Sequence, residues 1–366
     1  MKFDVQRDDI LGPLNVVLGI VEKKQTQPIL SNILINVKNG LITLTASDLQ
    51  MEIIATANVD SVKDGDITVP VRKFVDTCKT LDEGAKLTFS LNKEKAVITS
   101  NKTRFSLTTL PANDFPVINK DNPLLEFKIP EKSLKRLFDK VSFAMAFQDV
   151  RYYLNGLLLE INRDKLKTVA TDGHRLAISE AQFESGINEP KSVIIPRKAV
   201  LEISRLLGDS EEMVTVTFGQ NYIRLHFQNV IFTSKLVEGQ YPNYDSVIPK
   251  SCDIKISVNK NEIKQCLIRT SILSNEKYRG IKLEFSKNTL KTFANNPDQE
   301  EAKDEIPIDF DGGKLEVGFN VNYLIDAISA LDSDTVDINI TDSNGSSLIK
   351  ANDDDSCIYV VMPMRL

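Results

Sequence analysis

Tryptophan is absent from this chain of 366 residues, and several other features that assign a protein to a class are scarce. Gly and Pro number only 16 and 14, so long flexible or polyproline linkers are not expected. The uncharged apolar runs are short, such as Val16–Val21, whereas a transmembrane helix needs about 20 apolar residues. The segment Met1–Val5 alternates like a strand and lacks an apolar signal core. We therefore expect a cytoplasmic protein.

A positive net charge is also missing. The 45 Lys and Arg residues are outnumbered by 51 Asp and Glu residues, which gives a net charge of -6. This balance disfavours a generic basic nucleic-acid binder, although charges of opposite sign can still be segregated on the surface. The four cysteines show neither a CxxC pair nor zinc-ligand spacing. We expect thiols in a reducing compartment, with no metal and no cofactor.

Catalytic motifs are the last notable absence. The sequence contains no phosphate-binding GxxxxGK[ST], no GxGxxG before a helix, no HExxH and no GxSxG. Its only histidines are His174 and His226. His226 lies in an alternating segment and is expected on a sheet face. His174 lies in the polar cluster Thr171–Arg175, where Asp172 could hold it as a general base, although a binding loop is the preferred interpretation.

What the sequence does contain is an internal repeat. Ile42–Asp48 resembles Leu166–Asp172 and then Leu290–Asn296, at two steps of 124 residues. An apolar helical stripe and an N-terminal strand–helix pattern recur in the same order in each third. The period is much longer than the roughly 20–50 residues of solenoid repeats. Three copies of one domain are therefore predicted.

Each third alternates short strands with two amphipathic helices. Runs such as Ala85–Leu91, Val214–Phe218 and Val336–Ile340 have the two-residue period of strands. Two helices and about eight strands per copy predict an α+β fold in which helices pack on antiparallel sheet. Turn-forming residues place the predicted domains at 1–122, 123–250 and 251–366.

Basic residues recur on the predicted helices. On the helix that begins at Glu131, Lys132, Arg136 and Lys140 are spaced by four residues and share one face. Three other helices carry similar groups, among them Arg72 on one helix and Arg197, Lys198 and Arg205 on another. Ordinary solvated faces would explain a single case. Four cases favour a shared basic surface that contacts phosphates without reading sequence.

Four long segments resemble the bacterial DNA sliding clamps, the beta subunits of DNA polymerase III. They are Gln148–Gly156, Thr168–Ala177, Ile272–Gly280 and Val360–Leu366. The resemblance runs end to end and implies that the chain forms half of a closed ring, a head-to-tail homodimer around double-stranded DNA. A ring that slides along DNA needs no active site. The implied partners are the clamp loader, replicative and translesion polymerases, and mismatch repair and other clamp-motif proteins.

The resemblance also implies three groups of site residues. DNA contacts are expected at Lys24, Arg72, Gln148, Tyr152 and Tyr153, beside the basic helix residues Arg197, Lys198 and Arg205. The dimer interface is expected at Phe105, Leu107, Ile272 and Leu273. A pocket for partner peptides is expected at Leu154, Thr171, Gly173, His174, Arg175, Leu176, Pro242, Val247, Val360, Val361, Met362, Pro363 and Met364. Within it, His174 and Arg175 are expected to be polar anchors at the rim.

The sequence departs from its relatives at Phe147, where a histidine is common, and at Asp245 and Ser246, where some have basic residues. Two other functions stay open at this point. One is an enzyme acting on nucleic acid through Asp172, His174 and Arg175, and the other is a binding scaffold that forms no ring.

Overall fold

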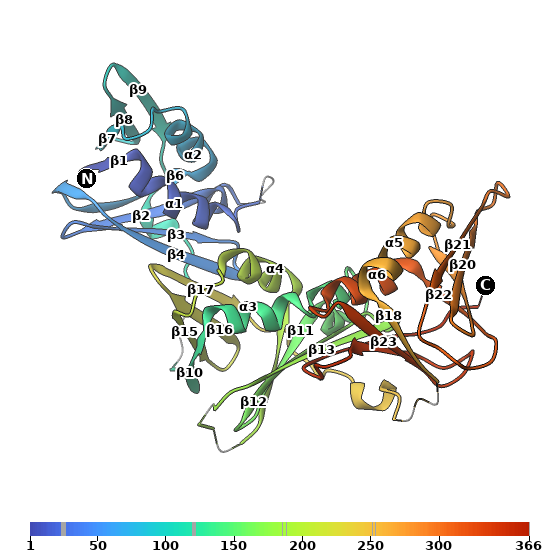
Figure 1. Cartoon of the computed structure of the whole chain (residues 1–366). Helices are drawn as coiled ribbons and strands as arrows, with labels where there is room; N and C mark the ends of the chain where they lie inside the picture. Colours follow the sequence, from blue (N-terminus) through green and yellow to red (C-terminus); the bar gives the residue numbers. More distant parts are fainter. Residues whose placement is uncertain are drawn as a thin grey trace. The chain divides into compact units, whose positions relative to one another are not determined.

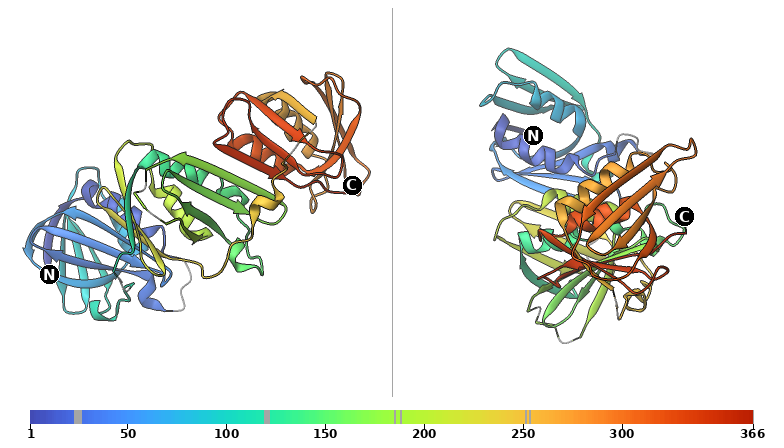
Figure 2. Two further views of the ribbon diagram at one scale, coloured as in Figure 1. Left: turned by 90° about the horizontal axis from the view of Figure 1, so that it is seen from below. Right: turned by 45° about the vertical axis from the view of Figure 1, so that its right-hand side comes forward.

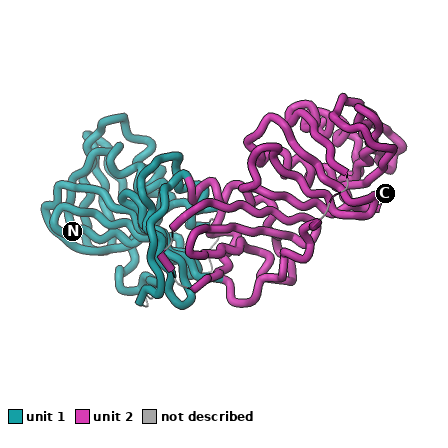
Figure 3. The backbone as a smooth tube through the Cα atoms, turned by 60° about the horizontal axis from the view of Figure 1, so that its bottom comes forward, with its two compact units in different colours: residues 1–132, 201–236 teal, residues 133–200, 237–366 magenta. Residues whose placement is uncertain are grey.

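The structure is a computed structural model that describes residues 1–22, 27–118, 122–184, 186–187, 189–250, 252 and 254–365. Its backbone forms two compact units (Figure 3). Unit 1 comprises residues 1–132 and 201–236, and unit 2 comprises residues 133–200 and 237–366. The predicted central domain is divided between the units, because each unit contains a sheet that joins strands from two thirds of the chain. The three-domain boundaries stay a prediction.

The described chain contains two α-helices in each third (Figure 1). These are α1 (Arg7–Leu18), α2 (Val71–Lys79), α3 (Glu131–Asp139), α4 (Arg197–Leu206), α5 (Lys260–Ser271) and α6 (Val321–Ala330). The described chain also contains five short 3-10 helices: η1 (Pro28–Ser31), η2 (Ala112–Asp114), η3 (Ser142–Ala144), η4 (Tyr152–Leu154) and η5 (Tyr244–Val247).

The strands account for most of the remaining structure. The first third contains β1 (Lys2–Gln6), β2 (Asn32–Lys38), β3 (Leu41–Ser47), β4 (Met51–Asn58), β5 (Asp60–Lys63), β6 (Gly65–Pro70), β7 (Lys86–Asn92), β8 (Lys95–Ser100) and β9 (Thr103–Thr108). The second contains β10 (Leu125–Pro130), β11 (Gly156–Ile161), β12 (Lys165–Thr171), β13 (Arg175–Gln182), β14 (Lys191–Pro196), β15 (Met213–Phe218), β16 (Tyr222–Phe227) and β17 (Val230–Lys235). The last contains β18 (Ile254–Asn259), β19 (Gly280–Ser286), β20 (Thr289–Asn295), β21 (Glu301–Pro307), β22 (Leu315–Asn320), β23 (Thr335–Ile340), β24 (Ser347–Ala351) and β25 (Cys357–Val361).

Unit 1 contains two antiparallel sheets. One has the strand order β5-β1-β7-β8-β9, and the other has the order β10-β15-β16-β17-β4-β3-β2-β6. The second sheet joins the first third to the second through the pairing of β17 with β4, which can be followed in Figure 2. Helix α1 packs on β3 and β4 and against α2. Phe3 stacks on Phe89 at 4.9 Å between ring centroids, and both rings are fully buried.

Unit 2 repeats this plan. One sheet has the order β14-β11-β12-β13-β25-β24-β23-β18, and the other has the order β21-β20-β19-β22. The pairing of β13 with β25 joins the second third to the last. Helix α5 packs on β20 and β21 and against α6 (Figure 1). The side chain of Asn259 caps α5 by accepting hydrogen bonds from the amides of Asn261 and Glu262, which satisfies N–H groups of the first turn.

Equivalent strand pairs confirm the threefold repeat. Val5 lies opposite Leu87, Ile129 opposite Val214, and Val258 opposite Val336. The predicted strands at 85–91, 214–218 and 336–340 correspond to β7, β15 and β23. The α+β fold with helices packed on antiparallel sheet is therefore confirmed. No α-helix in the described part of the chain is long and apolar enough to span a membrane.

Two cysteines behave as core residues. Cys78 on α2 and Cys266 on α5 are fully buried. Desolvation raises the pKa of the Cys78 thiol to about 12 and that of the Cys266 thiol to about 11. Neither thiol is therefore primed for reaction.

Candidate functional site

A mainly apolar cavity of about 190 Å³ opens on unit 2, where the second and last thirds of the chain meet. Its walls come from η4, the turn between β12 and β13, the segment 242–247 and the end of β25. The apolar lining residues are Tyr153, Leu154, Leu176, Pro242, Tyr244, Val247, Val360 and Met362. The polar lining residues are Arg151, Thr171, Gly173, Arg175 and Asn243.

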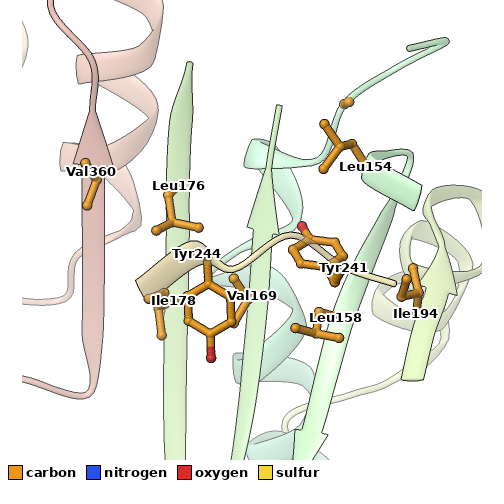
Figure 4. Close-up of a cluster of buried hydrophobic side chains, with 10 residues drawn as sticks. Leu154, Leu158, Val169, Leu176, Ile178, Ile194, Tyr241, Tyr244 and Val360 are labelled. Atoms are coloured by element: carbon orange, nitrogen blue, oxygen red, sulfur yellow. The ribbon is translucent and has the colours of Figure 1, made fainter. Parts of the chain in front are cut away.

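The base of the cavity is a cluster of buried side chains (Figure 4). Leu176 on β13 lies opposite Val360 on β25, so two paired strands from different thirds supply one apolar surface. In Figure 4 the segment that carries Tyr241 and Tyr244 crosses over β13 and the neighbouring β12, which carries Val169. The Tyr241 hydroxyl accepts a hydrogen bond from the Thr171 amide at 3.0 Å, and the Tyr244 hydroxyl donates to Glu160 at 2.6 Å. Both buried hydroxyls are thus satisfied while their rings face the cluster.

The turn between β12 and β13 forms the polar rim. Asp172 Oδ1 accepts hydrogen bonds from the amides of His174 at 2.9 Å and Arg175 at 3.1 Å. Gly173 has φ +88°, and a Cβ there would lie 3.0 Å from the Arg151 guanidinium. The positive φ therefore favours glycine, and any larger residue would also have to displace the end of the Arg151 side chain. Since Asp172 Oδ2 binds Arg175 Nε at 3.0 Å, its carboxylate holds the turn and Arg175, not the His174 ring.

Arg151 and Asp149 form an ion pair beside this turn. Arg151 Nη2 lies 2.8 Å from Asp149 Oδ2, and Arg151 Nε lies 3.0 Å from Asp149 Oδ1. Arg151 also donates to the Asp172 carbonyl at 3.3 Å. The hydrogen bond from the Arg151 side chain is the main reason that the pKa of Asp149 falls to about 2.

The structure changes the interpretation of Arg175. Its side chain is only 12% exposed and is bound by the protein itself. Nη1 lies 2.6 Å from Asp326 Oδ2, and Nη2 donates to the Phe143 carbonyl at 2.6 Å. The guanidinium also lies 4.5 Å from the centre of the Tyr323 ring. Arg175 lines the cavity, but its guanidinium is engaged by these groups, whereas His174 is exposed at the rim.

The C-terminal segment contributes fewer residues than the sequence suggested. The Met362 amide donates to the His174 carbonyl at 3.0 Å, and the Met364 amide donates to the Gly318 carbonyl at 2.8 Å. Met362 and Val360 line the cavity. The remaining predicted pocket residues do not: His174, Val361, Pro363 and Met364. Val361 is buried opposite Arg175, and Leu366 lies outside the described residues.

Four lining residues were not predicted for the pocket: Arg151, Tyr153, Asn243 and Tyr244. All four lie within three residues of Leu154 or Pro242, which were predicted for the pocket, so proximity along the chain was the available signal. Tyr153 was predicted to contact DNA. Tyr152 and Tyr153 begin η4, with their rings edge to face at 5.7 Å, and only Tyr152 is strongly exposed, at 57%.

The predicted DNA-contacting residues are spread over both units. Gln148 is exposed with φ 56°, Lys198 is exposed, and Lys24 lies outside the described residues. Three arginines also make internal hydrogen bonds. Arg72 donates to the Val21 carbonyl at 2.6 Å, Arg197 to the Met145 carbonyl at 2.7 Å, and Arg205 to the Glu202 carboxylate at 2.5 Å. Burial lowers the pKa of the Arg197 guanidinium, whereas the hydrogen bond to Glu202 raises that of Arg205.

The basic face expected on α3 is largely neutralised. Lys132 pairs with Glu211, and Lys140 pairs with Asp332. Arg136 lies 3.5 Å from Asp332 and 3.3 Å from Asp354. The cations that the sequence predicted for this helix face are therefore paired with carboxylates of the same chain.

The predicted interface residues fall on β9 and at the end of α5. Leu107 is buried and Phe105 is half-buried on β9, the last strand of its sheet. Ile272 is 73% exposed directly after α5, and Leu273 is half-buried. Such exposure of a large apolar side chain is typical of an association surface when it belongs to a patch.

Comparison with known families gives three adjoining matches. Residues 1–119 match the family described as DNA polymerase III beta subunit, N-terminal domain. Residues 128–243 match the central domain of that subunit, and residues 245–365 match its C-terminal domain.

Full-length relatives agree. The chain is 44% identical to a beta sliding clamp of Pseudomonas aeruginosa and 45% identical to that of Escherichia coli K12, each over 100% of both chains. A crystal structure of the P. aeruginosa sliding clamp bound to griselimycin superposes with a TM-score of 0.97 at 44% identity, covering 100% of both chains. The Caulobacter crescentus pol III beta structure gives a TM-score of 0.94 at 33% identity, again over both whole chains.

The ion pair at the rim leads to a pH prediction. The folded pKa of Asp149 is lower than its unfolded value, so the stability that the pair provides is present above the unfolded pKa and is lost as the pH falls toward 2. At about pH 3 Asp149 should remain ionised, whereas an ordinary exposed aspartate with a pKa of about 3.9 is mostly protonated. Carboxyl 13C shifts recorded against pH measure this directly. In Arg151→Ala the Asp149 titration should move up toward the ordinary range, and an unmoved curve would show that Arg151 is not the cause.

Proposed function

This chain belongs to the DNA polymerase III beta subunits, the bacterial beta sliding clamps, and we propose that two copies of it close head to tail into a ring around duplex DNA. As a sliding clamp of DNA polymerase III it is a DNA replication processivity factor and not a catalytic subunit. This assignment displaces the enzyme hypothesis for Asp172, His174 and Arg175, whose contacts stabilise a turn.

The observation that carries the ring proposal is the equivalence of strand edges in the three thirds. In unit 1, β4 pairs with β17, and in unit 2 the equivalent β13 pairs with β25. The third equivalents are β21 and β9, and each is the terminal strand of its sheet. Terminal strands present unpaired N–H and C=O groups that favour pairing with another chain. Pairing β21 of one copy with β9 of the other would complete the pattern twice and close the ring.

The internal pairs also predict the register of this contact. Phe232 on β17 lies opposite Ile53 on β4. Phe105 holds the position of Phe232, because Phe105 pairs with Ile98 as Phe232 pairs with Leu225. Ala302 holds the position of Ile53, because each pairs with the equivalent alanine of the preceding strand, Ala294 and Ala46. Phe105 should therefore face Ala302 of a second copy.

The charges on the two edges are complementary. Around β9, Lys95, Lys102 and Arg104 are exposed. Around β21, Glu300, Glu301 and Glu305 are exposed together with Lys303, which pairs with Glu301, so the edge is acidic on balance. Opposite charges at the two edges support a head-to-tail contact and disfavour the pairing of like edges.

The proposed hold on DNA is topological and sequence-independent. Phosphate contacts would come from Arg72, Arg197, Lys198, Arg205 and Lys24, with Gln148 and the exposed Tyr152 ring close to the strand. The internal hydrogen bonds of Arg72 and Arg205 leave part of each guanidinium available, since both side chains are exposed. We place this activity in the cytoplasm.

The cavity of unit 2 is the proposed docking site for short linear segments of the clamp loader, replicative and translesion polymerases, mismatch repair proteins and other clamp-motif proteins. Its apolar walls with a few polar groups at the rim have the usual composition of a binding site. Met362 suits a pocket that accepts several related ligands, because its side chain is flexible and polarizable.

The ring proposal predicts that Ile272→Ala combined with Leu273→Ala yields folded monomer. Removing apolar contact from the interface should shift a species of about twice 41.0 kDa to one of 41.0 kDa at micromolar concentration. Sedimentation velocity measures both masses. The control is Val150→Ala, which truncates a side chain that is 95% exposed elsewhere and should leave the dimer intact. A dimer that survives the double substitution would refute this interface.

The pocket proposal predicts that Met362→Ala weakens peptide binding at least about tenfold, the effect of losing about 1.4 kcal/mol of contact. Fluorescence anisotropy of a labelled peptide from the C-terminal tail of a bacterial replicative polymerase gives the affinity. Met213→Ala is the matched control, because Met213 is 50% exposed on β15 and lies outside the cavity. Dimerisation should be unchanged in both variants. Wild-type affinity in Met362→Ala would place the pocket elsewhere.

A further inference from the structure

Arg175 connects the rim of the cavity to helix α6. Leu176 and Arg175, neighbours at the start of β13, both line the cavity. The Arg175 guanidinium also reaches α6. It lies 2.6 Å from Asp326 and stacks over Tyr323, one helical turn earlier.

The same guanidinium also holds the turn at the rim of the cavity. Arg175 Nε binds Asp172 Oδ2 at 3.0 Å, while Asp172 Oδ1 accepts the amides of His174 and Arg175. Asp172 and Arg175 are only 16% and 12% exposed, so solvent screens their interaction weakly. The conformation of the rim is therefore linked through two charged contacts to a carboxylate on α6.

We propose that Asp326 is a positioning residue for the peptide pocket, acting from outside it through Arg175 and Asp172. This rests on the proposed function of the pocket. Asp326 lies on α6, is 41% exposed and does not line the cavity. Its described ion pair is with Arg175, which does. The Asp326 carboxylate binds Nη1 of the Arg175 guanidinium. Asp172 binds Nε, and the Phe143 carbonyl accepts a hydrogen bond from Nη2. Without the Asp326 carboxylate, the Arg175 guanidinium is free to move away from Asp172, and the turn is no longer held in its binding conformation.

The test compares Asp326→Asn with the wild type, using the labelled polymerase-tail peptide and the full-length dimer. Asp326→Asn should weaken peptide binding about three- to tenfold, the range expected when coupling is lost through a positioning contact. Asp326→Glu should recover most of the affinity. Asp332→Asn is the matched control, because Asp332 pairs with Arg136 of α3 and with Lys140 directly after it, and no described contact joins it to the turn. It should bind peptide like the wild type.

A second measurement separates positioning from a general loss of structure. In an Arg175→Gln background, Asp326→Asn should have no further effect on peptide affinity, because the pathway through the guanidinium is already removed. Amide exchange at His174 and Arg175 should accelerate in Asp326→Asn while the unfolding midpoint and dimer mass stay unchanged.

The outcomes are distinct. A wild-type protein that fails to bind the peptide would overturn the pocket itself. If the wild type binds the peptide and Asp326→Asn binds it with the same affinity, the pocket stands and the role of Asp326 is overturned. An equal loss in Asp332→Asn, or an undiminished effect of Asp326→Asn in the Arg175→Gln background, would also overturn it.

Discussion

Backbone pairing at strand edges is the constraint on which this structure depends. Every third of the chain builds one strand equivalent to β4 and one equivalent to β17. Four of these six strands pair within the chain, β4 with β17 and β13 with β25, and each pairing joins strands from two thirds of the chain in one compact unit. The remaining strands, β9 and β21, are each terminal in their sheets and differ in the sign of their net charge, which is why we propose a second copy as their partner.

The same junction explains where a binding pocket can form. Where β13 meets β25, Leu176 and Val360 bring apolar side chains from different thirds into contact, and the segment carrying Tyr241 and Tyr244 closes one side. At the equivalent junction of unit 1, Glu52 lies opposite Thr233. The Glu52 carboxylate there accepts a hydrogen bond from the Ile118 amide at 3.1 Å. One architecture thus supports an apolar cavity in unit 2 and a polar buried contact in unit 1.

Much of the fold could be predicted from the sequence, because two-residue alternation and the 124-residue step are local properties of the chain. The site was harder to predict. The resemblance assigned Leu154, Leu176, Val360 and Met362 to one pocket, and in the structure they line one cavity. It gave no indication that the Arg175 guanidinium is held by Asp172, Asp326 and the Phe143 carbonyl. The neutralised face of α3 was also missed, since Asp332 and Asp354 lie about 200 residues further along the chain. Pairings between such distant residues depend on the three-dimensional arrangement and leave no local pattern.

The central claim is that the protein holds DNA by enclosing it. The most direct test loads the protein with a clamp loader onto nicked circular DNA, raises the salt concentration enough to remove proteins held only by phosphate contacts, and then linearises half of the sample. Gel filtration reports the protein that remains with DNA. Enclosure predicts retention on the circles and loss from the linear molecules, because a ring slides off free ends. Equal release from both forms, or equal retention on both, would contradict it.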